Sequence, residues 1–193
     1  MHRQVILASQ SLQRKMLMDS VGIDYEIIPS ELDEKQILDQ DLKARSKKIA
    51  LLKAQTISTN NPEAIIIAAD TYGEYQGQVF EKPGTQNEAK QMLTKLSGKW
   101  FNSYTGFAYL DPLQSIKVSE IVITKALFRQ LSEAEIDYYV MHNSITTWSV
   151  GFSPAYPSGA ALIEKVEGSL TSFSYGLPME LVTKYLKKSH VIN

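Results

Sequence analysis

The sequence predicts an α/β protein, and three stretches of the chain carry that prediction. Residues 64–69 form a short apolar run rich in β-branched side chains, which is typical of a strand buried on both faces. A capping box at residues 85–88 opens a helix with an apolar inner face. Residues 99–110 and 115–128 have the composition of two long strands, which we expect to pair antiparallel. The chain therefore combines helices with both kinds of strand.

The other predicted elements follow from turn and capping signals. Ser9 or Ser11 can cap a helix that Gly22 ends, and Ser132 opens a short helix with a second capping box. The remaining predictions are strands at 4–8 and 24–29, a helix at 42–58, a hairpin with its tip at Gln76-Gly77, a loop at 144–159, a strand at 160–166 and a last helix from Pro178. Neither a repeat nor a linker interrupts the 193 residues, so we expect one domain spanning residues 1–193.

The composition excludes several classes of protein and site. A net charge of −1 argues against a nucleic acid polymer as partner, because proteins that bind one normally carry a basic face. The absence of cysteine excludes disulfides and thiolate metal sites, and the three histidines lack the paired spacing of a zinc site. The apolar segment at residues 5–8 is far too short for a signal peptide or a membrane span. We therefore expect a cytoplasmic protein without membrane contact.

Asp70 closes the apolar run of residues 64–69 and is the first candidate for a site residue. In open α/β sheets, ligands bind at the carboxyl ends of the strands, so an acid there can hold a metal ion or abstract a proton. A single aspartate after a strand more commonly caps a turn. The other candidate site residues of the chain are therefore needed to distinguish a functional acid from a turn cap.

Hydroxyl and cationic side chains occur where the predicted elements begin or end. Ser9 and Arg14 lie at a helix start, whose N–H groups favour phosphate, although an ordinary cap with solvated cations fits the same residues. Lys53 lies beside the inner stripe of a long helix, from which its ammonium can reach a neighbouring site. Lys82 precedes Pro83, which restricts the lysine backbone and suits a positioned cation; a turn lysine is the alternative.

Asp33 and Glu34 form an acidic pair in a predicted loop. Such a pair usually faces solvent, but it can also supply oxygen ligands to Mg²⁺. Together with the cations, and without cysteine or a usable histidine, this inventory fits the metal-assisted hydrolysis of a phosphate anhydride. In that chemistry cations neutralise the polyphosphate, carboxylates hold the metal ion, and one carboxylate activates water.

Three familiar motifs fail on particular residues. The chain has no Gly-x-x-x-x-Gly-Lys-Ser/Thr, which excludes a P-loop enzyme, and no Gly-x-Gly-x-x-Gly of a dinucleotide site. Residues 151–155 resemble the nucleophile elbow of a serine hydrolase around Ser153. The next residue is Pro154, which lacks the N–H that an oxyanion hole requires, so we discount this class.

Short blocks of the sequence resemble, in their order along the chain, the Maf family of nucleoside triphosphate pyrophosphatases. The blocks are Leu7-Ala-Ser9-x-Ser11-x-x-Arg14, Leu32-Asp33-Glu34, Lys53-Ala54, Ala69-Asp70-Thr71, Lys82-Pro83, Tyr104-Thr-Gly106, Leu131-Ser-x-x-Glu135-Ile, Glu167-Gly-Ser169 and Gly176-Leu-Pro178. The resemblance covers nearly the whole chain. It implies a mixed sheet in an α/β fold of the Maf and inosine-triphosphatase type, with two lobes around a central cleft. It also implies that members commonly form homodimers.

The same resemblance implies an activity. Members hydrolyse nucleoside triphosphates to a nucleoside monophosphate and pyrophosphate with Mg²⁺ or Mn²⁺, and we expect non-standard or surplus nucleotides to be the substrates. By position, Asp70 would activate water or hold the metal ion, and Glu34 would contribute to the metal site. The residues that would hold the phosphates are Ser9, Arg14, Lys53 and Lys82.

The segment at residues 148–156 departs from the family pattern. The pyrimidine-acting branch has Asp-Lys-Ala-Gly-x-Tyr-x-x-Gln here, and this chain lacks the acid, the lysine and the glutamine while keeping Gly151. The Cys-Ala-Gly-Ser-Phe of the branch linked to 7-methyl-GTP is not matched either. Trp148 and Tyr156 can stack on a base or pack the loop, and we expect packing. This departure leaves an alternative function, a catalytically weakened nucleotide-binding or regulatory relative.

Overall fold

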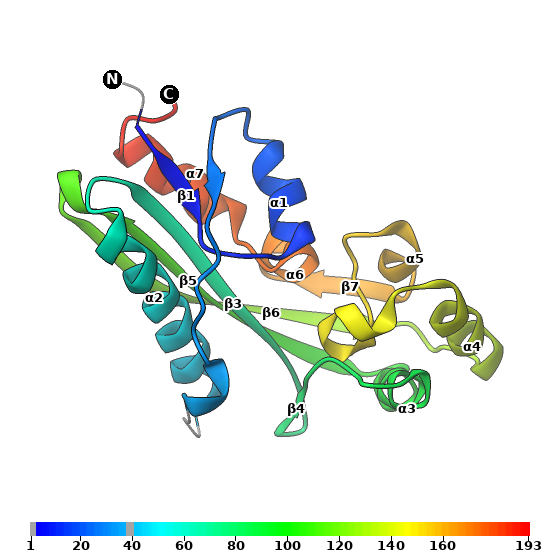
Figure 1. The fold of residues 1–193 in the computed structure, drawn as a ribbon. Helices are drawn as coiled ribbons and strands as arrows, with labels where there is room; N and C mark the ends of the chain where they lie inside the picture. The colour runs from blue at the N-terminus through cyan, green and yellow to red at the C-terminus, as the bar shows by residue number, and fades with distance from the viewer. Residues whose placement is uncertain (1–2, 38–40) are drawn as a thin grey trace. The chain divides into compact units, whose positions relative to one another are not determined.

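The computed structural model describes residues 3–37 and 41–193 (Figure 1). The strands are β1 (Val5–Leu7), β2 (Glu26–Ile27), β3 (Ile65–Tyr75), β4 (Gln78–Phe80), β5 (Trp100–Asp111), β6 (Ile116–Phe128) and β7 (Ile163–Glu167). The helices are α1 (Leu12–Asp19), α2 (Leu42–Asn60), α3 (Gln86–Leu96), α4 (Glu133–His142), α5 (Pro157–Ala160), α6 (Leu170–Tyr175) and α7 (Met179–Lys188). Among the helices of these residues, none is both long and apolar enough to cross a membrane.

Within the described residues, seven strands form one sheet in the order β2-β1-β3-β5-β6-β7, with β4 paired to β3. β1 runs parallel to both β2 and β3, and Val5 lies opposite Ile65. β4 is antiparallel to β3, and β7 is antiparallel to β6. β5 and β6 are neighbours joined by residues 112–115, a connection too short for parallel strands. The predicted α/β class and its mixed sheet are therefore confirmed.

The chain divides into two compact units. The first unit comprises Met1–Thr71, Thr105–Val122 and Gly176–Asn193, and the second comprises Tyr72–Tyr104 and Ile123–Tyr175. β3, β5 and β6 each belong partly to both units. Two units agree with the expected two lobes. The central cleft, and the assignment of residues 1–193 to one domain, stay predictions.

In the first unit, the side chains of β1 and β3 alternate between two apolar layers, as expected for strands buried on both faces. Val5 and Ile65 lie in the layer that α1 and α7 cover. Ile6 and Ile66 lie in the opposite layer, which α2 covers (Figure 1). All four side chains are almost completely buried. The strand that carries Asp70 is therefore held from both sides.

The second unit has its own core, built around aromatic rings. The ring of Phe152 lies 4.9 Å from Phe128 and 6.1 Å from Phe173, measured between centroids. Phe101 meets Phe128 edge-on at 6.1 Å. Tilted and edge-on pairs of this kind stabilise a core beyond simple burial. Phe152 thereby anchors the 148–156 segment, which departs from the family pattern, in the core of its own unit.

β3 is longer than the apolar run predicts. The expected strand stops at Asp70, but β3 continues to Tyr75 and turns through Gln76 and Gly77 into β4. The two turn residues have φ values of +52° and +79°, the left-handed conformation of a tight hairpin. Hydrophobicity marked only the doubly covered part of the strand, whereas pairing with β4 extends it. Asp70 thus lies within a strand, and the interpretation of Asp70 as a turn cap is wrong.

The other differences concern short elements. The predicted strand at 24–29 is reduced to β2, and the predicted strand at 160–166 begins only at Ile163, because α5 precedes it. The predicted loop at 144–159 contains two 3-10 turns, and α6 had no counterpart in the prediction. Elements this short contain too few residues for a periodic pattern to identify them.

A buried ion pair makes the stability of the first unit depend on pH. Arg3 Nη2 lies 2.6 Å from Oδ1 of Asp111, whose side chain is fully buried. Burial raises the pKa of Asp111, but hydrogen bonds from Arg3, Ser189 and the Gln114 amide outweigh burial and hold that pKa below its ordinary value of 3.8. A carboxyl group whose pKa is lower in the folded than in the unfolded state stabilises the fold at pH values above its unfolded-state pKa. That contribution is lost as the pH falls through the lower folded-state pKa.

We expect Arg3→Gln to lower the free energy of unfolding by about 2 kcal/mol near pH 7, because a charged hydrogen bond is lost. The loss should be smaller near pH 2, because protonation of the Asp111 carboxyl, as the pH falls through its lowered pKa, weakens the interaction with Arg3. Urea unfolding at the two pH values measures the difference. Lys15→Gln, which removes an exposed ion pair of 2.6 Å with Asp19, is the control and should cost less than about 0.5 kcal/mol. An equal loss from Arg3→Gln at both pH values would contradict the expectation.

Candidate active site

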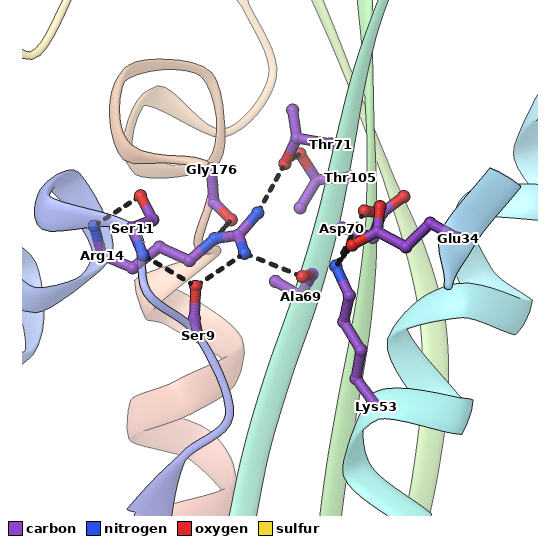
Figure 2. Close-up of polar contacts among 10 residues, drawn as sticks. All are labelled: Ser9, Ser11, Arg14, Glu34, Lys53, Ala69, Asp70, Thr71, Thr105 and Gly176. Atoms are coloured by element: carbon purple, nitrogen blue, oxygen red, sulfur yellow. Dashed lines mark hydrogen bonds and ion pairs between the residues drawn. The ribbon is translucent and has the colours of Figure 1, made fainter. Parts of the chain in front are cut away.

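The candidate site lies on β3 in the first unit, where one lysine joins two carboxylates (Figure 2). Lys53 Nζ lies 3.2 Å from Asp70 Oδ1 and 2.7 Å from Glu34 Oε1. Asp70 and Lys53 are only 5% and 9% exposed, so most of this charge is removed from water. The three residues come from β3, α2 and the short 3-10 turn at Glu34–Gln36. The structure thus brings together three of the predicted site residues.

Lys53 reaches Asp70 because the lysine belongs to the buried face of α2. We expected it beside the inner stripe of this helix, but it lies on the stripe itself. The buried residues of α2 are Ser46, Ile49, Ala50, Lys53, Ala54 and Ile57, at the spacing of one helical face. The helix begins at its N-cap Asp41, whose carboxylate accepts a hydrogen bond from the Lys43 amide. Small alanines on the buried face let the helix pack closely on the sheet, so the ammonium extends to the carboxylate.

One of the two carboxylate oxygens of Asp70 has no hydrogen-bond partner among the described residues. Within residues 3–37 and 41–193, its Oδ2 is buried and accepts no hydrogen bond. A buried oxygen without a donor costs free energy, and in native proteins such a group marks a place where a ligand, an ion or a water molecule completes the bonding. Oδ2 can therefore accept a proton or bind a cation. These are the two roles that the sequence predicted for Asp70.

The carboxylate pair is suited to a hard divalent cation. No three histidine, aspartate or glutamate side chains gather into a metal cage among the residues that the structure describes. Mg²⁺ in nucleotide sites commonly needs only one or two carboxylates, because phosphate oxygens and water complete its coordination. Glu34 and Asp70 supply such a pair, and the open Asp70 Oδ2 is an appropriate oxygen ligand. Asp33, the neighbour of Glu34, is exposed and accepts a hydrogen bond from Gln36.

The start of α1 approaches the same stretch of β3. Of the two predicted caps, Ser11 is the N-cap, and its Oγ accepts a hydrogen bond from the Arg14 amide. Ser9 Oγ instead accepts from the Ser11 amide at 3.2 Å and from Arg14 Nη1 at 3.1 Å. Burial lowers the pKa of Arg14, and the negative charges of Asp70 and Glu34 oppose that shift. Figure 2 shows Arg14 on one side of β3 and Lys53 on the other.

Arg14 and Lys53 contact neighbouring residues of one strand, from its two sides. Lys82 belongs to the second unit, where it is exposed, and its contact with phosphate stays a prediction. Three further positions bond within this region and were given no role beforehand: Thr71, Thr105 and Gly176. Each lay in a block that resembles the family, and that was the only available signal for them.

The 148–156 segment is packed within the second unit. The rings of Trp148 and Tyr156 lie 5.2 Å apart with a tilt of 33°, and Trp148 packs against the apolar core. The expected packing role is therefore confirmed, while stacking on a base stays untested. Val150 and Gly151 adopt φ of +66° and +72°, an unusual conformation for a β-branched residue. The Val150 amide donates to the Glu81 carbonyl, which helps to hold this backbone.

Solved structures of two other proteins share the fold. A HAM1 protein from Coxiella burnetii has a TM-score of 0.53, covering 96% of this chain and 99% of the other. The Ham1 protein of Staphylococcus aureus has a TM-score of 0.55, with coverages of 97% and 100%. Both are 13% identical to this chain, so the likeness concerns the fold alone. Fold and site together define an α/β protein that has the fold of the Ham1 proteins and a buried ion pair between a lysine and an aspartate.

Sequence comparison narrows this class to one family. The family model described as Maf-like protein matches residues 4–189. A dTTP/UTP pyrophosphatase from Syntrophus aciditrophicus is 33% identical over 184 residues, covering 95% of this chain and 89% of the relative. A dTTP/UTP pyrophosphatase from Thermotoga maritima is 33% identical over 187 residues, with coverages of 95% and 88%. The chain belongs to the Maf family, as its sequence blocks indicated.

Proposed function

We propose that this protein hydrolyses nucleoside triphosphates, non-standard or surplus ones among them, to a nucleoside monophosphate and pyrophosphate. One observation carries the proposal. Lys53 gathers the carboxylates of Asp70 and Glu34 at one point of β3, where an Asp70 oxygen is left without a donor. The relatives support the same reaction, since they are named dTTP/UTP pyrophosphatases.

In the proposed reaction, water adds across the anhydride between the α- and β-phosphates. Asp70 Oδ2 takes a proton from the attacking water, and the bridging oxygen leaves with the electron pair of the broken P–O bond. Lys53 holds the Asp70 carboxylate through its ion pair and adds positive charge where the phosphates gather. We propose that Ser9 and Lys82 also donate hydrogen bonds to the phosphates of the substrate.

Glu34 would hold Mg²⁺ or Mn²⁺, and Asp70 Oδ2 would bind the same ion where it does not take the proton of the attacking water. When bound, the ion would neutralise phosphate charge and polarise the phosphoryl oxygens. We further propose a cytoplasmic enzyme that acts on free nucleotides rather than on nucleic acid polymers or membranes, and that forms a homodimer. The homodimer rests on the family resemblance, and the exclusion of nucleic acid polymers rests on the net charge of −1.

The test is pyrophosphate release from a panel of ordinary and modified triphosphates, dTTP and UTP among them, with Mg²⁺ or Mn²⁺. We expect turnover on at least one member and a loss of about 10²-fold or more when EDTA removes the metal ion, because a metal ion supplies several kcal/mol to such a transition state. Re-addition of Mg²⁺ should restore the rate.

Calorimetry with the same panel separates the enzyme from its alternative. Affinity for a triphosphate without any product would overturn the hydrolase and favour the nucleotide-binding or regulatory relative. The altered 148–156 segment motivates that second candidate, because it lacks the polar residues of the pyrimidine-acting branch.

A further inference from the structure

The guanidinium of Arg14 is bound by the protein itself at four points. Its Nε donates to the Gly176 carbonyl at 2.9 Å, and Nη1 donates to Ser9 Oγ at 3.1 Å and to the Ala69 carbonyl at 2.8 Å. Nη2 donates to Thr71 Oγ1 at 3.3 Å. Four of the five N–H groups of the arginine are thus directed to oxygens of its own unit (Figure 2). A side chain that donates four hydrogen bonds to its own protein stabilises the positions of the segments that accept them.

Two of the four acceptors flank Asp70 in the sequence. Ala69 and Thr71 precede and follow it on β3, and successive residues of a strand point to opposite faces. Through Thr71 Oγ1 Arg14 contacts the face of the strand opposite to the Asp70 carboxylate, which turns toward Lys53 on α2, and through the Ala69 carbonyl it contacts the strand backbone. Figure 2 shows this division, with β3 between the two cations. The planar fork of an arginine is suited to holding two such points at a fixed separation.

The surroundings of Arg14 are built for this contact. Gly176 has φ +67°, and a Cβ there would lie 3.0 Å from Thr71 Oγ1 and 3.3 Å from Arg14 Nη2. Thr71 Oγ1 also shares a hydrogen bond of 3.1 Å with Thr105 Oγ1, which links β3 to β5. The guanidinium, the glycine turn and the threonine pair form one network across four segments of the first unit.

We propose that Arg14 is a positioning residue, which clamps β3 on either side of Asp70 and so aims its carboxylate at the reacting water. This inference rests on the proposed function and assigns Arg14 a task different from holding phosphate. The distinction is measurable. Removal of a group that holds phosphate changes the Kd of a bound triphosphate analogue, whereas removal of a clamp acts on the chemical step and leaves that Kd nearly unchanged.

The decisive variants are Arg14→Lys and Arg14→Ala. We expect both to lower kcat by about 10²-fold, because a displacement of about 1 Å at a catalytic group has an effect of that size. The Kd of an α,β-methylene triphosphate analogue, measured by calorimetry, should stay within about threefold of the wild-type value. Arg129→Lys is the matched control, since Arg129 also donates to a backbone carbonyl, at Ala161, and is exposed. Its kcat should be unchanged.

Gly176→Ala tests the clamp without altering any group assigned to substrate. The added Cβ displaces Arg14 and Thr71, so kcat should fall while the analogue Kd holds. Because both changes act through one contact, the double variant Gly176→Ala with Arg14→Lys should lose little more than either single variant. Urea unfolding of every variant shows which of them remain folded under assay conditions.

Two kinetic results would overturn the clamp. The first is retention of most activity in Arg14→Lys, and the second is an increase in analogue Kd of tenfold or more in Arg14→Ala with kcat preserved. A wild-type protein without turnover would refute the proposed function but not the clamp. In that case, a crystal structure of Arg14→Lys decides: a displaced Asp70 carboxylate supports the clamp, and an unmoved one overturns it.

Discussion

Asp70→Asn is expected to lower kcat by about 10²-fold or more, the size of effect typical for loss of a general base or of a metal ligand. The amide keeps the shape of the side chain but can neither accept the proton of the attacking water nor bind a cation strongly. Lys53 keeps its ion pair with Glu34 at 2.7 Å, so the lysine is not left unpaired. Pyrophosphate release at saturating triphosphate and metal concentrations measures the effect.

Asp137→Asn is the matched control for this variant. Asp137 also pairs with a lysine, Lys90 at 2.6 Å, but lies on the exposed surface of the second unit. Its loss should leave kcat within about twofold, because exposed ion pairs contribute little. Turnover of Asp70→Asn close to the wild-type rate would place the chemistry on another residue.

Gly106→Ala should lower the free energy of unfolding by about 3 kcal/mol or more. A Cβ at position 106 would overlap the Ser46 carbonyl and come within 2.6 Å of the Lys47 amide nitrogen. Those atoms are helix backbone and cannot rotate away, so α2 itself has to move. Because α2 carries Lys53 two turns further on, activity should fall together with the urea midpoint.

Gly84→Ala is the control for Gly106→Ala. Its Cβ would lie 3.4 Å from the Glu88 carboxylate, an ordinary contact with a mobile side chain. The free energy of unfolding should therefore change by less than about 0.5 kcal/mol. If both alanine variants unfold at the wild-type urea concentration, the close approach of α2 to β5 is not a constraint on stability.

Patterns within a single element predicted the long elements well. The capping signals of α3 and α4 act within one helical turn, and the structure has Thr85 and Ser132 as their N-caps. The strands β5 and β6 were recognised from composition to within a residue or two at each end. Each of these signals depends only on neighbouring residues, which is why the sequence alone was sufficient.

The contacts of the site depend on distant parts of the chain. Arg14 bonds to Thr71 and Gly176, which are 57 and 162 positions away, so no local pattern contains them. The position of Lys53 was misjudged for a related reason. A lysine on a buried helical face interrupts the hydrophobic period, and its burial becomes favourable only through Glu34, earlier in the chain, and Asp70, 17 residues later. The topology of the sheet, which brings β1 beside β3, supplies these partners.

The oxygens that hold Arg14 have a further consequence, because all four of them are uncharged. In the described part of the chain, the charge of Lys53 is balanced by two carboxylates, whereas no carboxylate contacts the guanidinium. Dipoles can solvate a cation without cancelling it. Asp70 and Glu34 also act on the guanidinium through space, so the two cations and two carboxylates of this region together carry no net charge, and dissolved salt confines any field that they produce to about 8 Å at physiological ionic strength.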